Sequence, residues 1–204
     1  MPDFEIEEQS FGMVVGVDEV GRGAWAGPVV AAAVIIDRSS IEISTLRLIK
    51  DSKQISELNR FKIEQILTDT ASVISAVGSA SVAEIDNSNI LDASLLAMQR
   101  AYNNLPVSAD TALVDGLQAP DIRCPVKTVV KGDTKSVSIA AASIFAKVHR
   151  DNIMIKLAKN LPSYQWEKNK GYGTANHKIG LKTNGVTIHH RKTFSPIALL
   201  LQNK

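Results

Sequence analysis

Cysteine is nearly absent from this sequence, since Cys124 is the only one in 204 residues. A single thiol forms no intramolecular disulfide and builds no thiolate metal cluster, so a buried and unreactive role is expected for it. Long apolar runs are also missing, and none approaches the ~20 residues of a membrane span. The amino terminus lacks the basic-then-apolar pattern of a signal peptide. These absences predict a soluble cytoplasmic protein that crosses no membrane.

Acidic residues are missing from one part of the chain. Residues 168–204 contain seven Lys and Arg residues and no Asp or Glu, whereas the amino end is acidic, although the net charge is only +2. This asymmetry is typical of a protein that meets a polyanion near its basic end, and a solvated basic face is the simpler alternative. With 45% apolar residues, the chain is long enough to bury a substantial core within one domain.

A short acidic and glycine-rich segment lies between two apolar runs, residues 13–17 and 29–36, which we predict to be strands. It contains Asp18, Glu19, Gly21, Arg22 and Gly23. Adjacent carboxylates at the end of a buried strand need a cation or hydrogen bonds to stay ionised. Glycines allow a ligand to approach the backbone closely, and arginine suits phosphate.

Three interpretations compete for this segment. A dinucleotide-binding glycine loop is disfavoured for two reasons. The gap before its third glycine, Gly27, is one residue too long, and a strand follows where the fingerprint requires a helix. A glycine-rich hairpin with solvated acids is the structural alternative. The third is a metal–carboxylate site with a backbone platform for nucleic acid, which requires further carboxylates elsewhere in the chain.

The remaining patterns predict a mixed α/β fold with helices packed on a sheet. Further strands are expected at 70–80, 111–114 and 126–130, and helices from Ser56, over 90–105 and over 136–157. The last helix begins with small residues, which would let it lie close to the sheet. We expect residues 1–11 to be a loose segment. Residues 12–204 form one domain, with loops and short helical pieces from about 160.

Carboxylates follow three of the predicted strands: Asp18 with Glu19, then Asp115, then Asp133. Strand ends in one sheet can converge on one place. Carboxylate oxygens without thiolates favour Mg²⁺ or Mn²⁺, and two such ions can drive phosphodiester hydrolysis.

Each acid also has an ordinary interpretation. Asp133 is placed to cap the helix that follows it, and Asp115 with Gly116 is a common turn. Asp18 and Glu19 point to opposite faces unless the strand twists or ends between them. Their joint occurrence at strand ends nevertheless favours a metal site.

Six segments together resemble type 2 ribonuclease H in its bacterial form. They are DEVGRG, AGPVVAAAVI, DSKQIS, KGDTKSVSIAAASIFAKVHRD, GYGT and HRKTFSPI, which occur in the family's order and span residues 14–196. Each segment alone is weakly specific, and the set is highly specific.

The resemblance implies a ribonuclease H-like fold with a five-stranded mixed β-sheet flanked by helices and a small helical carboxyl-terminal extension. It implies an endonuclease that cuts the RNA strand of RNA–DNA hybrids, and that also cuts 5′ of single ribonucleotides embedded in duplex DNA, leaving 5′-phosphates. It further implies a two-metal-ion mechanism with Mn²⁺ or Mg²⁺, a role in ribonucleotide excision repair, and a monomer.

The resemblance also implies roles for individual residues. The family's metal-binding catalytic acids fall on Asp18, Glu19, Asp115 and Asp133. Backbone groups of Gly21, Arg22 and Gly23 are implied to contact the 2′-hydroxyl, and Tyr172 is implied to pack on the sugar at the RNA–DNA junction. Lys53 and Lys147 are implied candidates for phosphate contact. These roles agree with the physical expectation that a 2′-hydroxyl distinguishes RNA from DNA.

Several positions depart from the family pattern without removing a ligand. Ala24 and Trp25 stand where proline and leucine are expected, Leu117 where asparagine is common, and Thr193 where serine is usual. The alternatives are a catalytically silent hybrid-binding protein, which the presence of all four acids disfavours, and the related type 3 enzyme. Type 3 proteins usually carry an amino-terminal substrate-binding domain, for which residues 1–12 are too short.

Overall fold

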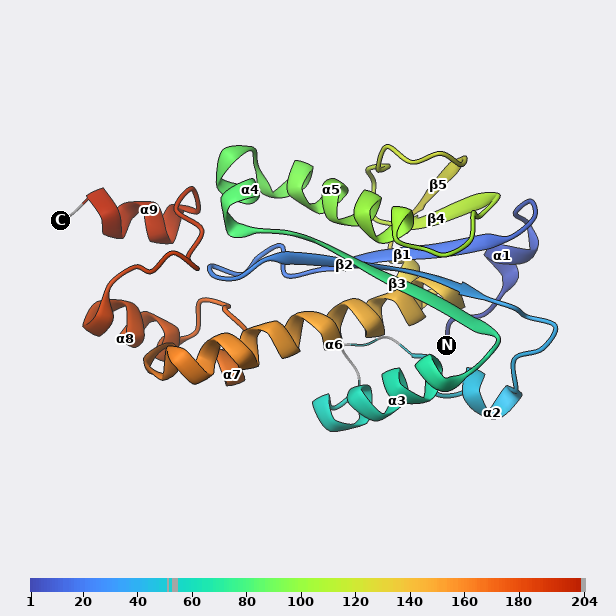
Figure 1. Ribbon diagram of the computed structural model, residues 1–204, viewed down its shortest axis with the longest axis horizontal. Coiled ribbons are helices and arrows are strands. Elements are labelled where there is room, and N and C mark those ends of the chain that lie inside the picture. The colour runs from blue at the N-terminus through green and yellow to red at the C-terminus, as the bar shows by residue number, and fades with distance from the viewer. Residues whose placement is uncertain (51, 53–54, 203–204) are drawn as a thin grey trace.

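The computed structural model describes residues 1–50, 52 and 55–202, and a five-stranded sheet lies at its centre (Figure 1). The strand order is β3-β2-β1-β4-β5. Strand β1 pairs antiparallel with β2 and parallel with β4, and β4 pairs parallel with β5. The strands are β1 (Val14–Val20), β2 (Val29–Ile36), β3 (Val73–Ala80), β4 (Thr111–Asp115) and β5 (Val126–Val129). The expected mixed sheet is therefore confirmed.

Helices cover both faces of the sheet (Figure 1). Helix α5 (Ile90–Asn103) packs on one face, and α6 (Val137–Asn160) with α3 (Glu57–Asp69) packs on the other. Shorter helical elements complete the described chain: α1 (Glu5–Glu8), α2 (Ile43–Leu46), α4 (Val82–Asn87), η2 (Gly132–Thr134), η3 (Pro162–Tyr164), α7 (Trp166–Asn169), α8 (Ala175–Asn184) and α9 (Ser195–Gln202). None of the described helices is long and apolar enough to cross a membrane.

Helix α6 lies close against the central strand, as its small residues predicted. A Cβ atom added to Gly16 of β1 would collide with the backbone of Ser138 and Ile139 in α6. Alanines 140, 141 and 142 of this helix are fully buried. Helix and strand thus approach at backbone distance, which brings the first turns of α6 beside the carboxyl end of β1.

Two local features differ from the sequence-based expectations. Strand β1 runs on to Val20 because Asp18 and Glu19 remain paired with Ala32 and Ala31 of β2, so both acids lie within the strand. The amino-terminal segment, which we expected to be loose, forms α1 and contacts α6. The Glu7 carboxylate accepts hydrogen bonds from the Ser136 hydroxyl and from the Ser138 backbone N–H at 2.6 and 3.0 Å. An acidic side chain is favourable at a helix amino terminus, which explains the docking.

Candidate active site

Asp18 is a buried carboxylate on the face of β1 that meets α6. Its residue is 5% exposed. Burial raises the pKa of Asp18 well above its usual range, and the nearby charges of Glu19, Asp115 and Asp133 raise it further, while a hydrogen bond with Ser143 of α6 opposes them. The four predicted acids are therefore electrostatic neighbours, and ionising all of them together is unfavourable without a cation.

Glu19 follows on the opposite face of β1, toward α5. Burial raises the pKa of Glu19, Arg22 lowers it, and Asp115 raises it. The Arg22 guanidinium contacts Glu19 Oε1 at 3.1 Å. The other oxygen, Oε2, is buried and accepts no hydrogen bond from the residues that the structure describes. A buried carboxylate oxygen without a donor is costly to hold, and a bound cation would satisfy it.

Asp115 and Asp133 come from the neighbouring strand ends. Asp115 is the last residue of β4, and its Oδ1 accepts a hydrogen bond from the Gly132 backbone N–H at 2.6 Å. Asp133 lies in the turn η2 after β5 and is 4% exposed. It does not cap α6, because Ser136 is the N-cap and accepts from the Ile139 backbone N–H. The capping interpretation of Asp133 is thereby excluded.

The donor set of this cluster consists of carboxylate oxygens from three parallel strand ends. Oxygen donors of this kind fit Mg²⁺ or Mn²⁺. Among the described residues, no three His, Cys, Asp or Glu side chains are grouped closely enough to hold a metal ion as they stand. The acids are electrostatic neighbours that, as they stand, do not form a coordination sphere among the described residues.

The glycine-rich segment after β1, residues 21–28, is called the glycine loop here. The Arg150 guanidinium, fully buried in α6, donates to the carbonyls of Pro28, Ala26 and Lys170 at 2.8–3.0 Å. Gly21 adopts φ +95°, and a Cβ atom there would collide with the Arg150 side chain. Glycine is therefore required at position 21 both for the backbone conformation and for the space.

Arg191 supports the same loop from the carboxyl-terminal part of the chain. It is fully buried and donates to the carbonyls of Gly27 and Arg22 at 3.0 and 2.8 Å. Burial lowers the pKa of Arg191, and the positive charge of Arg150 lowers it further. The conformation of the glycine loop is thus fixed by two buried arginines. The sequence analysis assigned Arg150 no role, and Arg191 was expected to hold phosphates with Lys182 and Lys192, which its burial contradicts.

Tyr172 lies next to the glycine loop. A Cβ atom on Gly23 would lie 3.8 Å from Cε1 of the Tyr172 ring. The residue is 37% exposed, and the Arg150 guanidinium lies 5.7 Å from its ring centroid. The glycine loop and Tyr172 are far apart in the sequence but adjacent in space. They carry the predicted 2′-hydroxyl contact and the predicted sugar contact.

A family model described as ribonuclease HII matches residues 15–196. The chain belongs to the ribonuclease HII family. It is 50% identical to a ribonuclease HII of Paramagnetospirillum magneticum over 97% of this chain and 98% of the relative. It is 51% identical to a ribonuclease HII of Rhodospirillum rubrum over 97% of this chain and 90% of that relative. The protein is accordingly an endoribonuclease of the ribonuclease H type, and its family membership supports endonuclease action on RNA–DNA hybrids.

Solved structures agree on the fold. The chain matches the ribonuclease H2 of Pyrococcus horikoshii with a TM-score of 0.77 and 26% identity, covering 93% of this chain and 97% of that one. It also matches Bst-RNase HIII in complex with Mn²⁺ with a TM-score of 0.76 and 22% identity, over 94% of this chain and 70% of the other. The predicted ribonuclease H-like fold is confirmed.

Within this ribonuclease HII fold, the predicted phosphate-contact lysines differ in what the structure shows. Lys147 is half-buried on α6, and its Nζ contacts Asp151 Oδ1 at 2.6 Å. Burial lowers the pKa of Lys147, and the Asp151 carboxylate opposes this effect. Lys53 lies outside the described residues. The hydroxyl of Ser52 pairs with that of Ser143 at 2.8 Å, and Ser143 also hydrogen-bonds to Asp18.

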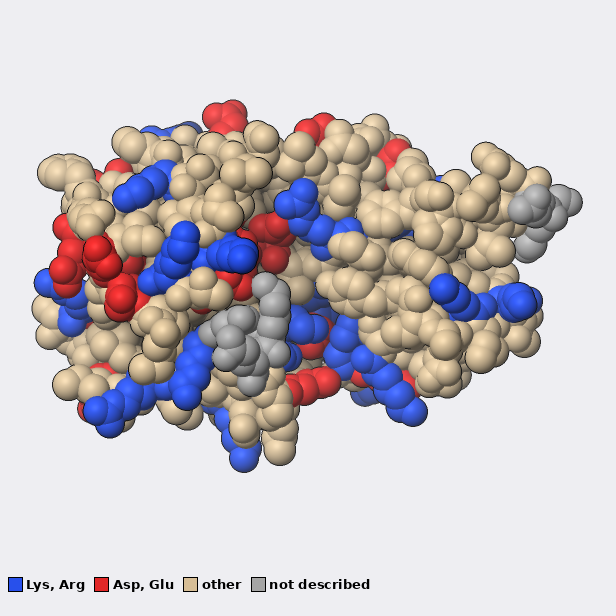
Figure 2. All heavy atoms as spheres, turned by 180° about the vertical axis from the view of Figure 1, so that it is seen from behind, with Lys and Arg blue, Asp and Glu red and all other residues tan. Residues whose placement is uncertain are grey.

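The basic carboxyl-terminal stretch is less exposed than its composition suggested. Arg191 is buried under the glycine loop, and Lys170 is buried with its Nζ 2.9 Å from Glu57 Oε1. Lys182 and Lys192 are exposed. Figure 2 shows Lys and Arg side chains on both halves of one face, with acidic side chains set between them near its middle. Some charges of the stretch therefore stabilise the fold, and only the exposed ones can meet a polyanion.

Trp25 shows how the chain accommodates one departure from the family pattern. Its backbone N–H donates to the Gly171 carbonyl at 2.8 Å. Its ring covers Gly173, where an added Cβ would collide with it, and Lys178 Nζ lies 5.7 Å from the ring centroid. Trp25 thus packs the glycine loop onto the segment that carries Tyr172.

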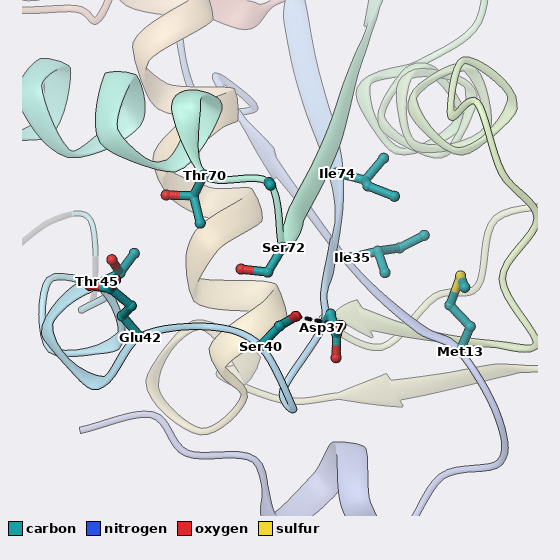
Figure 3. A pocket seen from close by; sticks show the side chains of 10 residues that line it. Met13, Ile35, Asp37, Ser40, Glu42, Thr45, Thr70, Ser72 and Ile74 are labelled. Carbon is teal, nitrogen blue, oxygen red and sulfur yellow. Dashed lines mark hydrogen bonds between the residues drawn. The ribbon is translucent and has the colours of Figure 1, made fainter.

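A large pocket lies away from these residues (Figure 3). It has a cavity volume of about 700 Å³ and lies where β1 and β3 begin and β2 ends, lined among others by Met13, Ile35 and Ile74. None of the predicted site residues that the structure describes lines it. A smaller cleft of about 340 Å³ is lined by Glu19, Arg22 and Asp115 and borders α5. The smaller cleft is therefore the one that belongs to the carboxylate cluster.

Proposed function

We propose that this ribonuclease HII hydrolyses the RNA strand of RNA–DNA hybrids and also cuts 5′ of single ribonucleotides embedded in duplex DNA, using two divalent cations, Mg²⁺ or Mn²⁺. The observation that carries the proposal is the convergence of four carboxylates beside a glycine loop and an exposed tyrosine. Such a protein acts in the removal of ribonucleotides from DNA, in the cytoplasm and as a monomer.

Asp18, Glu19, Asp115 and Asp133 are the residues that would hold the cations. The raised pKa values of Asp18 and Glu19 support this assignment, because burial disfavours the ionised form of both carboxylates, and Glu19 Oε2 accepts no hydrogen bond from the described residues. Divalent cations bound there supply an activated water and stabilise charge on the leaving oxygen. The structural relative Bst-RNase HIII has been solved in complex with Mn²⁺, which agrees with this donor set.

The glycine loop recognises the ribonucleotide. The backbone of Gly21, Arg22 and Gly23 offers N–H and C=O groups without bulky side chains, and a 2′-hydroxyl uses both because it donates and accepts. The buried arginines that hold this loop keep its groups in one orientation. Preorganised groups of this kind lose little entropy when the substrate binds.

Tyr172 checks the sugar next to the ribonucleotide. Its ring is partly exposed beside Gly23, so one nucleotide can contact the loop while its neighbour contacts the ring. An aromatic ring accommodates a deoxyribose face and would be crowded by an added hydroxyl. Lys53, Lys147 and the exposed lysines of the carboxyl-terminal stretch then bind phosphates without regard to sequence.

Product mapping tests the proposal. An end-labelled duplex with a single ribonucleotide, a duplex with a continuous RNA strand and an all-DNA duplex are incubated with the enzyme and Mg²⁺ or Mn²⁺. We expect the first to be cut only 5′ of the ribonucleotide, leaving a 5′-phosphate, the second to be cut at many sites, and the third to stay intact. Cleavage of the continuous hybrid alone contradicts the junction role. Binding without any cleavage contradicts the catalytic proposal.

A further inference from the structure

A chain of buried rings lies directly behind Tyr172. His177 in α8 and His190 are both fully buried, and their Nε2 atoms are 3.1 Å apart. The indole Nε1–H of Trp166 donates to the same Nε2 of His177, also at 3.1 Å. On its other side, His177 Nδ1 lies 3.0 Å from the backbone carbonyl of Tyr172. The metal-binding acids have no part in these contacts.

The hydrogen bonds assign the proton on each ring. His190 Nδ1 accepts from the Thr187 backbone N–H at 3.0 Å, so a neutral His190 carries its proton on Nε2. That proton and the Trp166 indole N–H share the single lone pair of His177 Nε2, which therefore bears no proton. A neutral His177 then carries its proton on Nδ1 and donates it to the Tyr172 carbonyl. Both rings are fully used in this one arrangement.

The backbone of Tyr172 is consequently held at both of its polar groups. Its carbonyl accepts from His177 Nδ1–H and from the Thr174 backbone N–H, the latter at 2.8 Å. Its own N–H donates to the Asn169 carbonyl at 2.9 Å. The backbone of Tyr172 is therefore held in place, with its ring beside Gly23 of the glycine loop.

We propose that His177 is a positioning residue for junction recognition, set in its tautomer by His190 and holding Tyr172 at the glycine loop through the Nδ1–H bond. This inference rests on the proposed function of Tyr172. His177 touches no substrate and acts through the tyrosine. Its loss therefore impairs cleavage that depends on Tyr172 more than cleavage of a continuous hybrid, which offers many alternative registers to the metal site.

Two amide variants separate the two ring nitrogens. In His177→Asn the side-chain NH₂ stands near the position of Nδ1 and can still donate to Tyr172. In His177→Gln the amide reaches the position of Nε2 and serves Trp166 and His190 without reaching Tyr172. We expect His177→Gln to lower kcat/KM on the single-ribonucleotide duplex about tenfold relative to kcat/KM on the continuous hybrid, which is the size of one buried hydrogen bond. For His177→Asn, the same ratio should stay within about threefold of the wild-type ratio.

The matched control is Tyr164→Phe, which removes a 2.8 Å hydrogen bond from the Tyr164 hydroxyl to the Gly185 carbonyl in the same aromatic cluster. It should leave the ratio of the two substrates unchanged. An equal fall on both substrates in His177→Gln, or the same altered ratio in Tyr164→Phe, overturns the inference. If Tyr172→Ala itself leaves the ratio unchanged, the proposed function of Tyr172 has failed, which is a different result.

A measurement on the wild-type protein does not depend on whether the variants fold. Nitrogen-15 NMR of the histidine rings at neutral pH should show the proton on Nδ1 of His177 and on Nε2 of His190. The opposite tautomer at His177 overturns the inference, because an unprotonated Nδ1 has nothing to donate to the Tyr172 carbonyl.

Discussion

Asp115 and Gly132 are joined by a 2.6 Å hydrogen bond from the Gly132 backbone N–H to the Asp115 carboxylate. This bond ties the end of β4 to the turn that carries Asp133, so two of the four acids are placed by a single contact. A Cβ atom on Gly132 would lie 3.3 Å from the same carboxylate oxygen, which leaves little room for any other residue. The acids of the cluster are thus held by backbone geometry as well as by their strands.

Replacing Asp18 by asparagine should abolish cleavage and stabilise the metal-free protein. The pKa of Asp18 is raised in the folded state, so its ionised form is disfavoured there relative to the unfolded chain at neutral pH. Asn removes that penalty, and it also removes a cation ligand worth several kcal/mol to the reaction, or on the order of 10³-fold in rate. Cleavage rates and urea unfolding in EDTA measure the two effects.

Asp69→Asn is the matched control for this prediction, because Asp69 is an exposed acid at the end of α3. It should change neither the cleavage rate nor the stability to urea in EDTA. Turnover of Asp18→Asn close to that of wild type with Mg²⁺ or Mn²⁺ would show that Asp18 is not a ligand.

The strands and helices around these acids followed from local patterns. Strand β2 has the bounds that its apolar run predicted, and α3 begins after Ser56 because its hydroxyl accepts from the Asn59 backbone N–H. That the acids lie near enough to influence one another's charge was also predictable, since it needs only strand direction. Periodicity and turn chemistry act over a few residues, so these features could be predicted without knowledge of contacts between distant parts of the sequence.

The residues that hold the site were not predictable in this way. Arg150 and Arg191 stand in polar stretches where an exposed role is the default for arginine, and their partners are backbone carbonyls on a loop more than 120 residues away for Arg150 and more than 160 for Arg191. His177 gave no periodic signal either. The glycine loop offered one indirect sign, because glycines such as Gly21 and Gly27, where a Cβ atom would collide with a neighbour, imply a side chain packed against the loop.

Glycine at position 21 should be more sensitive to substitution than glycine at position 116. Both have positive φ, +95° and +100°, so alanine costs each about 1 kcal/mol of backbone strain. At Gly21 the added methyl group also meets Arg150, whereas at Gly116 nothing lies within 4 Å. Gly21→Ala should therefore lower the unfolding free energy further than Gly116→Ala in urea titrations. Equal losses would mean that Arg150 moves aside freely.

Stability should fall as the pH drops below the ordinary histidine range. Burial, followed by the charge of His177, lowers the pKa of His190 to about 4 from an ordinary value of 6.5. The unfolded chain binds this proton first, so stability is complete above pH 6.5 and decreases toward pH 4 by up to about 3 kcal/mol. Urea unfolding across this range measures the slope.

In His190→Asn, an amide oxygen can still accept from Thr187 but does not titrate. Its stability should depend less on pH between 4 and 6.5 than that of wild type. An identical slope in the two proteins would assign the pH dependence to other groups whose pKa is lowered in the folded state, such as His177 and His149.

Salt should weaken substrate binding through the exposed lysines only. Replacing Lys182 and Lys192 by alanine should reduce the slope of log K against log salt by about 0.9 for each phosphate contact that is lost. The control pair, Lys62→Ala with Lys159→Ala, removes the same charge from exposed positions on α3 and α6. Fluorescence anisotropy with a labelled duplex at several salt concentrations measures both. The same change of slope in the two pairs would indicate a diffuse charge effect.

Helix α6 contacts both Asp18 and the glycine loop. Its Ser143 bonds to Asp18, and seven residues later its Arg150 holds the glycine loop. At 1.5 Å of rise per residue these positions are about 10 Å apart along a stiff rod. In the proposed function, the length of this helical segment would set the distance between the glycine loop that contacts the ribonucleotide and the acids that hold the cations. An extra residue between 143 and 150 would rotate Arg150 by about 100° about the helix axis relative to Ser143. Arg150 would then no longer hold the glycine loop in its present position relative to Asp18.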